Sequence, residues 1–298
     1  MNIIAEINTD DKIEKRDIEI YSFKNQNIFN DFLNNKLNNN CNYSYNGIIK
    51  TIDNKILIFQ RKGSFELDKL NAIVHGKNIQ ITHKNFYDII KNLDEKEIKL
   101  IKRIILDIDN KIDEKEIINK IYNNVKDKSF VKKLFAISKF INQNHKYRFE
   151  DISKNYVNKN IIRNITVKTN YNRFDFKTLT KKNLFILPGG KKSKKDTSIE
   201  DTIKREIYEE LGKRIKFELK IDYFHIIKSK ITDYIIKNTF NDITLFCSID
   251  KTSNEIINNF KINREISNIE YLEINYSKFK PIKNNLILSL LTILSVIN

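Results

Sequence analysis

Hydrophobic residues follow different patterns in different parts of the chain. Two short runs rich in Ile and Leu, residues 47–52 and 56–61, flank Asp53-Asn54-Lys55, which is typical of a β-hairpin. From about residue 93 to 141, apolar residues recur at helical spacing among Lys and Glu and predict several amphipathic helices. Residues 240–249 predict another strand. The sequence therefore predicts an α+β protein.

Two further stretches allow more than one interpretation. Residues 145–182 are basic, rich in Asn and sprinkled with aromatic residues, without a clear period. This composition is compatible with a loop region that faces nucleic acid, because basic residues follow phosphates and aromatic rings stack on bases, or with a solvated connector. Residues 286–297 are apolar over about 12 positions, too few to cross a bilayer of about 30 Å. We expect a packed C-terminal helix there, with a membrane-surface contact as the alternative.

A helix is predicted from about Ser198 to Leu211. Its apolar residues repeat every four positions and form a stripe that packs on the core: Ile199, Ile203, Ile207 and Leu211. Either Thr197 with Glu200 or Ser198 with Asp201 can form a capping box at its start. Gly212 is a natural C-terminal cap.

Three carboxylates lie close together on this predicted helix. Glu206 precedes Glu209 and Glu210 by three and four residues, so it shares a helix face with both. Like charges at this spacing repel each other, and a cation among them relieves the repulsion; hard oxygen ligands favour Mg²⁺ or Mn²⁺. Gly189 and Gly190, in the turn before the helix, allow the backbone to approach a phosphate closely. Together these features predict a metal-dependent site for a phosphate group.

Composition adds limits to this picture. With 298 residues, 40% of them hydrophobic, we expect one core domain with a sizeable insertion. The formal charge of +16 would attract a phosphate-bearing polymer, although a general excess of Lys, Asn and Ile along the chain can also account for it. Cys41 and Cys247 cannot form a disulfide framework, which indicates a reducing compartment. The polar residues 1–12 are neither a signal peptide nor an anchor.

The order of residues 190–212 resembles the Nudix box. In that family a Gly is followed by five residues, a Glu, seven residues, Arg-Glu and an apolar residue, one residue, Glu-Glu, one residue, and Gly before an apolar residue. The matching positions here are Gly190, Arg205, Glu206, Ile207, Glu209, Glu210 and Gly212. The chain departs from the pattern in three ways: one extra residue precedes the Arg, Asp196 or Thr197 stands where the first Glu belongs, and Lys213 replaces an apolar residue.

The Nudix resemblance implies a pyrophosphohydrolase with an α/β/α sandwich and a catalytic box at residues 189–212. It implies that Glu206, Glu209 and Glu210 bind the metal ions that neutralise phosphate charge and lower the pKa of the attacking water. Arg205 would orient the carboxylates rather than touch substrate. Because the first Glu of the family mainly supports this Arg and the loop, the departure concerns the loop geometry.

The similarity extends beyond the box to the mRNA-decapping enzymes of poxviruses and related large cytoplasmic DNA viruses. Residues 53–65 resemble their first hairpin, which ends in a basic pair followed by Ser-Phe. Asp233 and Phe240 keep the seven-residue separation of an acid and an aromatic residue in that family. Residues 263–266, Asn-Arg-Glu-Ile, match a short Glu-containing motif near its end.

This closer resemblance implies a site for an mRNA cap. Phe65 and Phe240 would sandwich the positively charged 7-methylguanine, with a cation-π gain of about 1 to 2 kcal/mol when desolvated. Asp233 is the first choice for the acid on the guanine edge and Asp17 the second, while Glu265 would be an additional metal ligand or general base. The alternatives are that Phe240 is an ordinary core residue of its strand and that Phe65 packs against the insertion.

We therefore expect a Nudix domain formed by residues 1–65 and 183–298, with a mainly helical insertion at 66–182 that lies beside the cap pocket and offers a basic path to the RNA body. The expected reaction is metal-assisted attack of water on the cap pyrophosphate, which releases 7-methylguanosine diphosphate and RNA with a 5′-monophosphate. The expected partner is capped mRNA, with no specificity for DNA. We expect a monomer without a transmembrane segment in the cytoplasm, that of an infected host cell if the viral resemblance holds. The alternatives are a Nudix hydrolase of free nucleoside diphosphate derivatives and a non-catalytic cap- or RNA-binding module.

Overall fold

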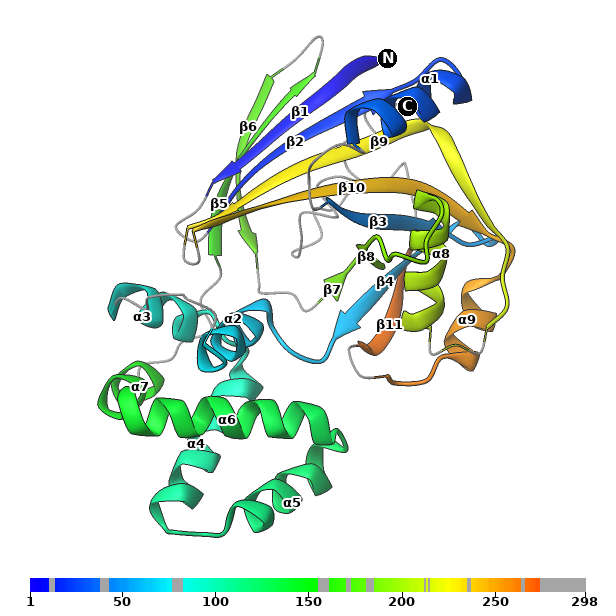
Figure 1. Cartoon of the computed structure of the whole chain (residues 1–298). Coiled ribbons are helices and arrows are strands. Elements are labelled where there is room, and N and C mark those ends of the chain that lie inside the picture. The colour runs from blue at the N-terminus through cyan, green and yellow to red at the C-terminus, as the bar shows by residue number, and fades with distance from the viewer. Residues whose placement is uncertain are drawn as a thin grey trace. The chain divides into compact units, whose positions relative to one another are not determined.

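The chain forms two compact units in the computed structural model (Figure 1). The structure describes residues 1–10, 14–37, 43–76, 83–154, 161–169, 173–180, 185–211, 213, 215–234, 237–263 and 266–273. One unit, here the sheet unit, comprises residues 1–61 and 161–298, and the other, the helical unit, comprises Lys62–Asn160. The described residues combine helices with one mixed sheet, so the predicted α+β class is confirmed.

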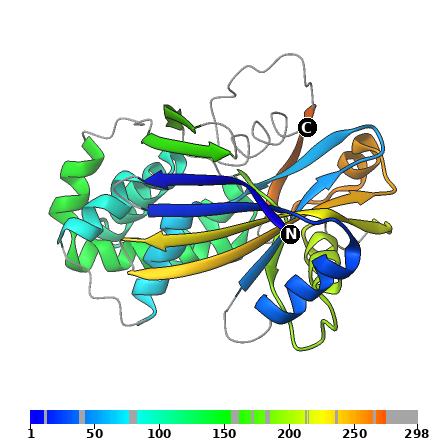
Figure 2. The same cartoon turned by 90° about the horizontal axis from the view of Figure 1, so that it is seen from above.

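The sheet unit is built on 11 strands within its described residues. Figure 2 shows the long strands of this sheet from above. Their order is β11-β4-β3-β10-β9-β2-β1-β5-β6, while β7 pairs with β4 and β8 pairs with β3. The pairing of β3 with β10 is parallel, and the other neighbours are antiparallel. The strands are β1 (Asn2–Asp10), β2 (Glu14–Ser22), β3 (Tyr43–Lys50), β4 (Lys55–Arg61), β5 (Ile161–Thr169), β6 (Arg173–Thr180), β7 (Phe185–Ile186), β8 (Gly189–Lys191), β9 (Leu219–Asp233), β10 (Asn238–Ile249) and β11 (Ile266–Glu273).

Two apolar clusters occupy opposite faces of the central strands. The larger cluster includes residues of α1 (Gln26–Leu37) and α8 (Ile199–Glu210), and Ile256 of α9 (Ser253–Asn259) also belongs to it. Its members include Ile203 and Ile207 of α8 and Leu211, the C-cap of that helix, which are all fully buried. Ile199 is partly buried and packs against the cluster, so the predicted stripe is confirmed. We call this side of the sheet the core face. The smaller cluster defines the second face and consists of Ala5, Ile7, Ile18, Ile20, Ile48, Ile56 and Ile227.

The predicted hairpin around residues 53–55 is present only at its turn. Asn54 has a φ of 57°, and the Thr51 amide donates to the Lys55 carbonyl at 2.9 Å. β3 and β4, however, pair only where Lys50 faces Ile56. Beyond that point β3 pairs with β8 and β10, and β4 pairs with β7 and β11. Each strand is therefore completed by segments that are distant in the sequence.

The helical unit contains six helices in its described residues. They are α2 (Phe65–Val74), α3 (His83–Lys91), α4 (Glu95–Asp109), α5 (Glu114–Val125), α6 (Lys128–Asn144) and α7 (Lys146–Lys154). The helices predicted between residues 93 and 141 are thus confirmed as α4, α5 and α6. Each of these three begins after an Asp whose side chain accepts a hydrogen bond from a backbone amide of the first turn. α6 contacts α2, α4, α5 and α7.

The helical part is shorter than the predicted insertion at 66–182. Residues 161–180 contribute β5 and β6, an antiparallel pair that joins the sheet through β1. The expectation of a loop region or connector was wrong for these strands. β5 is rich in Ile, Thr and Val, residues that favour strands, but Asn and Lys among them obscured the pattern. One of its two partners, β1, is distant in the sequence, and local periodicity does not reveal such a pairing.

Among the described residues, no helix is both long enough and apolar enough to cross a membrane. The predicted C-terminal helix at residues 286–297 lies outside the described residues, as does Cys41. Cys247 is buried in β10, and burial raises the pKa of its thiol.

Candidate active site

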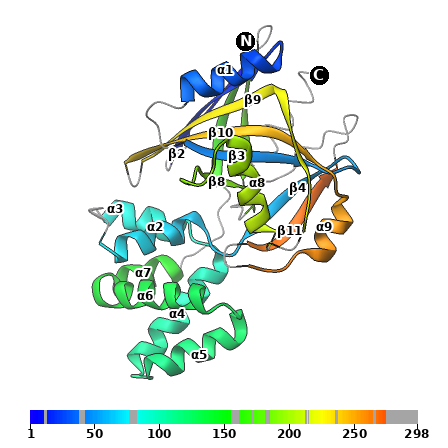
Figure 3. The ribbon, with the colours of Figure 1, turned by 45° about the vertical axis from the view of Figure 1, so that its right-hand side comes forward.

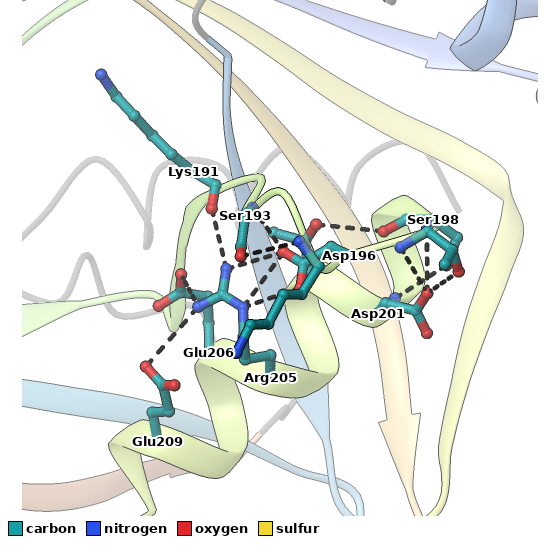
Figure 4. Close-up of polar contacts among 11 residues, drawn as sticks. Lys191, Ser193, Asp196, Ser198, Asp201, Arg205, Glu206 and Glu209 are labelled. Atoms are coloured by element: carbon teal, nitrogen blue, oxygen red, sulfur yellow. Dashed lines mark hydrogen bonds and ion pairs between the residues drawn. The ribbon is translucent and has the colours of Figure 1, made fainter.

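The start of α8 is fixed by side chains of its first turn (Figure 4). Ser198 is the N-cap: its Oγ accepts from the Asp201 amide at 3.0 Å, and Asp201 Oδ2 accepts from the Ser198 amide at 3.0 Å. The Thr197 amide also donates to Asp201 Oδ2, at 3.1 Å. Of the two predicted capping boxes, the one formed by Ser198 and Asp201 is confirmed.

Arg205 ties the preceding loop to α8 (Figure 4). Its Nε donates to Asp196 Oδ1 at 3.0 Å, and its Nη2 donates to Asp196 Oδ2 at 3.0 Å and to the Lys191 carbonyl at 2.9 Å. Its Nη1 lies 2.7 Å from Glu206 Oε1. The hydrogen bonds from Arg205 lower the pKa of Asp196 to about 2, and Asp196 in turn raises the pKa of Arg205. Asp196, rather than Thr197, therefore supports the arginine and the loop.

Gly189 and Gly190 are required by close packing inside the protein. A Cβ atom on Gly189 would lie 2.3 Å from the Tyr45 carbonyl oxygen, and one on Gly190 would lie 2.3 Å from Glu206 Oε1. Neither glycine has a positive φ, so left-handed backbone is not the reason for them. Gly190 allows the Glu206 carboxylate to lie directly against the backbone of β8. β8 lies beside α8 (Figure 3). The close approach of a phosphate to this turn stays a prediction.

The three glutamates of α8 have different surroundings. Glu206 lies between Gly190 and Arg205, and the Glu209 carboxylate, 3.7 Å from Arg205 Nη1, is partly exposed. Glu210 is only 7% exposed. In the part of the chain that the structure describes, no three acidic, His or Cys side chains are grouped so that they could hold a metal ion. The donor set still suits Mg²⁺ or Mn²⁺, because it consists of carboxylates on one rigid helix and includes a buried carboxylate that a cation would stabilise.

Glu265 lies outside the described residues, but the positions around it are anchored to α8. Asn263 Nδ2 donates to the Glu210 carbonyl at 2.6 Å. Asn263 Oδ1 accepts from the Ile266 amide at 2.8 Å. The chain therefore reaches the end of α8 that carries Glu209 and Glu210 shortly before Glu265.

Asp233 and Phe240 point from the second face of the sheet. Phe240 of β10 is paired with Ile231 of β9, two residues before Asp233, and alternate residues of a strand share a face. Asp233 is buried and Phe240 is 40% exposed, so Phe240 is not an ordinary core residue. Asp17 is paired with Lys230 and points from the core face, where its carboxylate lies 3.2 Å from Lys15 Nζ. The structure therefore brings Asp233 and Phe240 together without Asp17.

Three further charged residues share this part of the second face and were not predicted from the sequence. Glu14 is paired with Asp233, and Arg16 is paired with Ile231; Arg16 Nε donates to Glu14 Oε1 at 2.7 Å. Asp242 of β10 is half-buried, and burial raises the pKa of its carboxyl. The run of charged residues at 14–17 in β2 was the available signal for Glu14 and Arg16, but such a run is also typical of an ordinary solvated strand. We call Glu14, Arg16, Asp233, Phe240 and Asp242 the polar face.

Phe65 belongs to the helical unit, where it is the first residue of α2. Ser64 caps this helix, and its Oγ accepts from the Leu67 amide at 3.1 Å. The buried carboxylate of Glu97 accepts from both the amide and the hydroxyl of Ser64, each at 2.7 Å. Phe65 is 54% exposed at this fixed helix start, which argues against a packing role. Because Phe65 and Phe240 belong to different units, the cap sandwich stays a prediction.

No protein-family model matches this chain, and no curated protein matches it significantly in sequence. The resemblance to the Nudix box and to the viral decapping enzymes therefore depends on the residues described above.

Proposed function

We propose that this protein is a metal-dependent hydrolase with the Nudix sandwich fold, and that it cleaves the pyrophosphate of an mRNA cap. The observation that carries the proposal is the arrangement at Arg205. This guanidinium holds the loop through Asp196 and holds Glu206 against the Gly190 backbone. The two remaining box carboxylates, Glu209 and Glu210, lie one turn further along the same helix.

The residues that would hold Mg²⁺ or Mn²⁺ are Glu206, Glu209 and Glu210, together with Glu265. When bound, such ions neutralise phosphate charge and lower the pKa of the attacking water. Arg205 is a positioning residue and does not contact the substrate, because its Nε, Nη1 and Nη2 atoms all contact acceptors of the protein. Its role is to keep the Glu206 carboxylate in place before substrate arrives.

The polar face supports a nucleotide as the substrate. Phe240 offers an exposed ring on which methylated guanine, a cation, can stack. Asp233, two residues beyond the Ile231 that pairs with Phe240, accepts hydrogen bonds from the guanine edge. Phe65, the other aromatic residue of the predicted sandwich, is exposed at the start of α2 in the helical unit.

The helical unit supports RNA as the body of the substrate. It carries 21 Lys and Arg residues against 14 Asp and Glu residues. α6 contains four lysines and no acidic residue, and Lys128, Lys132 and Lys139 are exposed on it. Positive charge of this kind binds a phosphodiester chain without sequence preference and with strong dependence on salt. We therefore assign the basic path for RNA to α6.

The test is hydrolysis of RNA labelled in its cap, with Mg²⁺ or Mn²⁺ and with a chelator as the control. We expect labelled 7-methylguanosine diphosphate to be released only when the metal is present. Equal or faster cleavage of free nucleoside diphosphate derivatives would favour the nucleotide hydrolase. Tight binding of capped RNA without any product would favour a non-catalytic binding module.

A further inference from the structure

In the register of the sheet, Asp242 lies between Phe240, the proposed base-binding residue, and β8, the strand before the proposed phosphate turn. It follows Phe240 by two residues on β10, so both side chains point from the second face. On the other side, Asp242 is paired with Ser44 of β3, and Ser44 is paired with Lys191 of β8. From ordinary strand dimensions, its Cα lies about 7 Å from that of Phe240 and about 10 Å from that of Lys191.

Phe240 has one acidic residue on each side along the sheet. Asp233 pairs with Asn238 and so lies beyond Phe240, toward the end of the β9–β10 hairpin. Asp242 lies on the side of Phe240 that leads to β8 and its turn. Figure 4 shows the Lys191 side chain directed away from Arg205, although its carbonyl accepts from that residue. The order along the polar face is therefore Asp233, Phe240, Asp242 and then β8.

The Asp242 carboxyl has no hydrogen-bond or ion-pair partner among the described residues, and it is half-buried. Burial raises its pKa, and the positive charge of Arg16 offsets this only in part. The Arg16 guanidinium is itself bound to Glu14 at 2.7 Å. A partly desolvated acceptor without a donor is unfavourable, and a hydroxyl of a ligand would relieve that cost.

We propose that Asp242 accepts hydrogen bonds from the ribose hydroxyls of the cap nucleoside. This assignment rests on the proposed function, in which Phe240 binds the base and the β8 turn approaches the diphosphate. The ribose joins base to phosphate, so a group between those two parts of the site faces the sugar. Its two neighbouring hydroxyls are donors for a carboxylate, and an acidic residue binds ribose in the same way in dinucleotide-binding folds.

The experiment compares wild type with Asp242→Ala for binding of 7-methylguanosine diphosphate and of its 2′,3′-dideoxy form. We expect the variant to bind the ordinary nucleotide about 10-fold more weakly, as for loss of a hydrogen bond to a charged group. The dideoxy nucleotide should bind equally to both proteins, because it lacks the donors. Asp31→Ala on α1, an exposed position far from β10 in the sequence, is the control and should change neither constant.

An equal loss with both nucleotides would overturn the ribose assignment, and so would unchanged binding of the ordinary one. Failure of wild type to bind either nucleotide would overturn it as well. Failure of the proposed hydrolysis gives a result that is distinct from failure of the ribose assignment. Capped RNA would not be cleaved, while ribose-dependent binding through Asp242 would persist. Thermal melting of the variant checks its folding, and we expect no destabilisation because a half-buried carboxyl is removed.

Discussion

The acidic residues around Arg205 and those around Arg16 differ in how many of them form hydrogen bonds or ion pairs with the arginine. At α8, Arg205 binds Asp196, Glu206 and the Lys191 carbonyl, and the pKa of Asp196 falls to about 2. On the polar face, Arg16 is bound to Glu14, while burial raises the pKa of Asp242. The first group is already organised in the free protein. In the second group the Asp242 carboxyl has no donor among the described residues, which suits the proposed recognition of a ligand.

The largest effect should follow from neutralising a carboxylate at the end of α8. Glu210→Gln keeps the size of the side chain but removes an oxygen that we propose binds metal, so we expect cap hydrolysis to fall about 1000-fold, the equivalent of several kcal/mol. Glu200→Gln, in the first turn of the same helix, is the matched control and should retain activity. Single-turnover rates measure both. A fully active Glu210→Gln protein would remove the metal role from α8.

A methyl group at Gly190 should disturb the organised group without removing any charge. Its Cβ would lie 2.3 Å from Glu206 Oε1, so the carboxylate must leave its place beside Arg205. We expect Gly190→Ala to lower kcat about 100-fold, because a small misplacement of a positioning group is costly. Gly76→Asn, at a position with open space and a φ of 74°, provides the control. Unchanged kcat in Gly190→Ala would show that the fixed position of Glu206 is unimportant.

Removing the ring of Phe240 should weaken recognition more than chemistry. We expect Phe240→Ala to raise KM for capped RNA about 10-fold and to reduce the preference for a methylated over an unmethylated cap. Phe224→Ala removes another exposed ring, on β9 of the same unit, and should have no such effect. If both variants lost activity equally on both caps, Phe240 would not be the stacking residue.

The two aspartates should respond to pH in opposite directions. The folded pKa of Asp196, about 2, is below its ordinary value of 3.8, so its ionised form stabilises the fold above pH 3.8 and this contribution is lost as the pH falls toward 2. The folded pKa of Asp242 is raised, so its ionised form destabilises the fold at neutral pH, and this cost is absent below pH 3.8.

Melting temperatures of two amide variants measure this difference. At pH 7 we expect Asp196→Asn to lower Tm by about 5 °C and Asp242→Asn to raise it by about 2 °C. The effect of Asp242→Asn should disappear below about pH 4, before that of Asp196→Asn. Shifts of the same sign at pH 7 would contradict the contrast between the two groups.

Local signals were sufficient to predict α8 and its charged residues. The Ile stripe, the Ser198–Asp201 box and the spacing of the glutamates all lie within one short segment, so neighbours in sequence are neighbours in space. The strand from 240 to 249 was predicted for the same reason and is confirmed as β10. The sequence left two adjacent candidates, Asp196 and Thr197, for the residue that supports Arg205. It could not decide between them, because the choice depends on the path of the loop.

Features that depend on distant pairing could not be predicted. β5 and β6 join the sheet through β1, and the Lys- and Asn-rich composition around them gave no period. The position of Asp242 near β8 could not be predicted from the sequence. It follows from the register of β10 with β3 and of β3 with β8. Asp17 was proposed as a cap-binding acid because it is acidic and precedes the first predicted hairpin. In the structure it pairs with Lys230 and points from the core face, whereas its neighbour Arg16 points from the second face.

The most direct test of the central claim is mass spectrometry of the products formed from capped RNA in ¹⁸O-labelled water with Mg²⁺ or Mn²⁺. Attack of water on the cap pyrophosphate predicts 7-methylguanosine diphosphate and RNA with a 5′-monophosphate, with one ¹⁸O atom in a phosphate of one product. Release of 7-methylguanosine monophosphate, or the absence of any labelled product at high enzyme concentration, would contradict the proposed reaction.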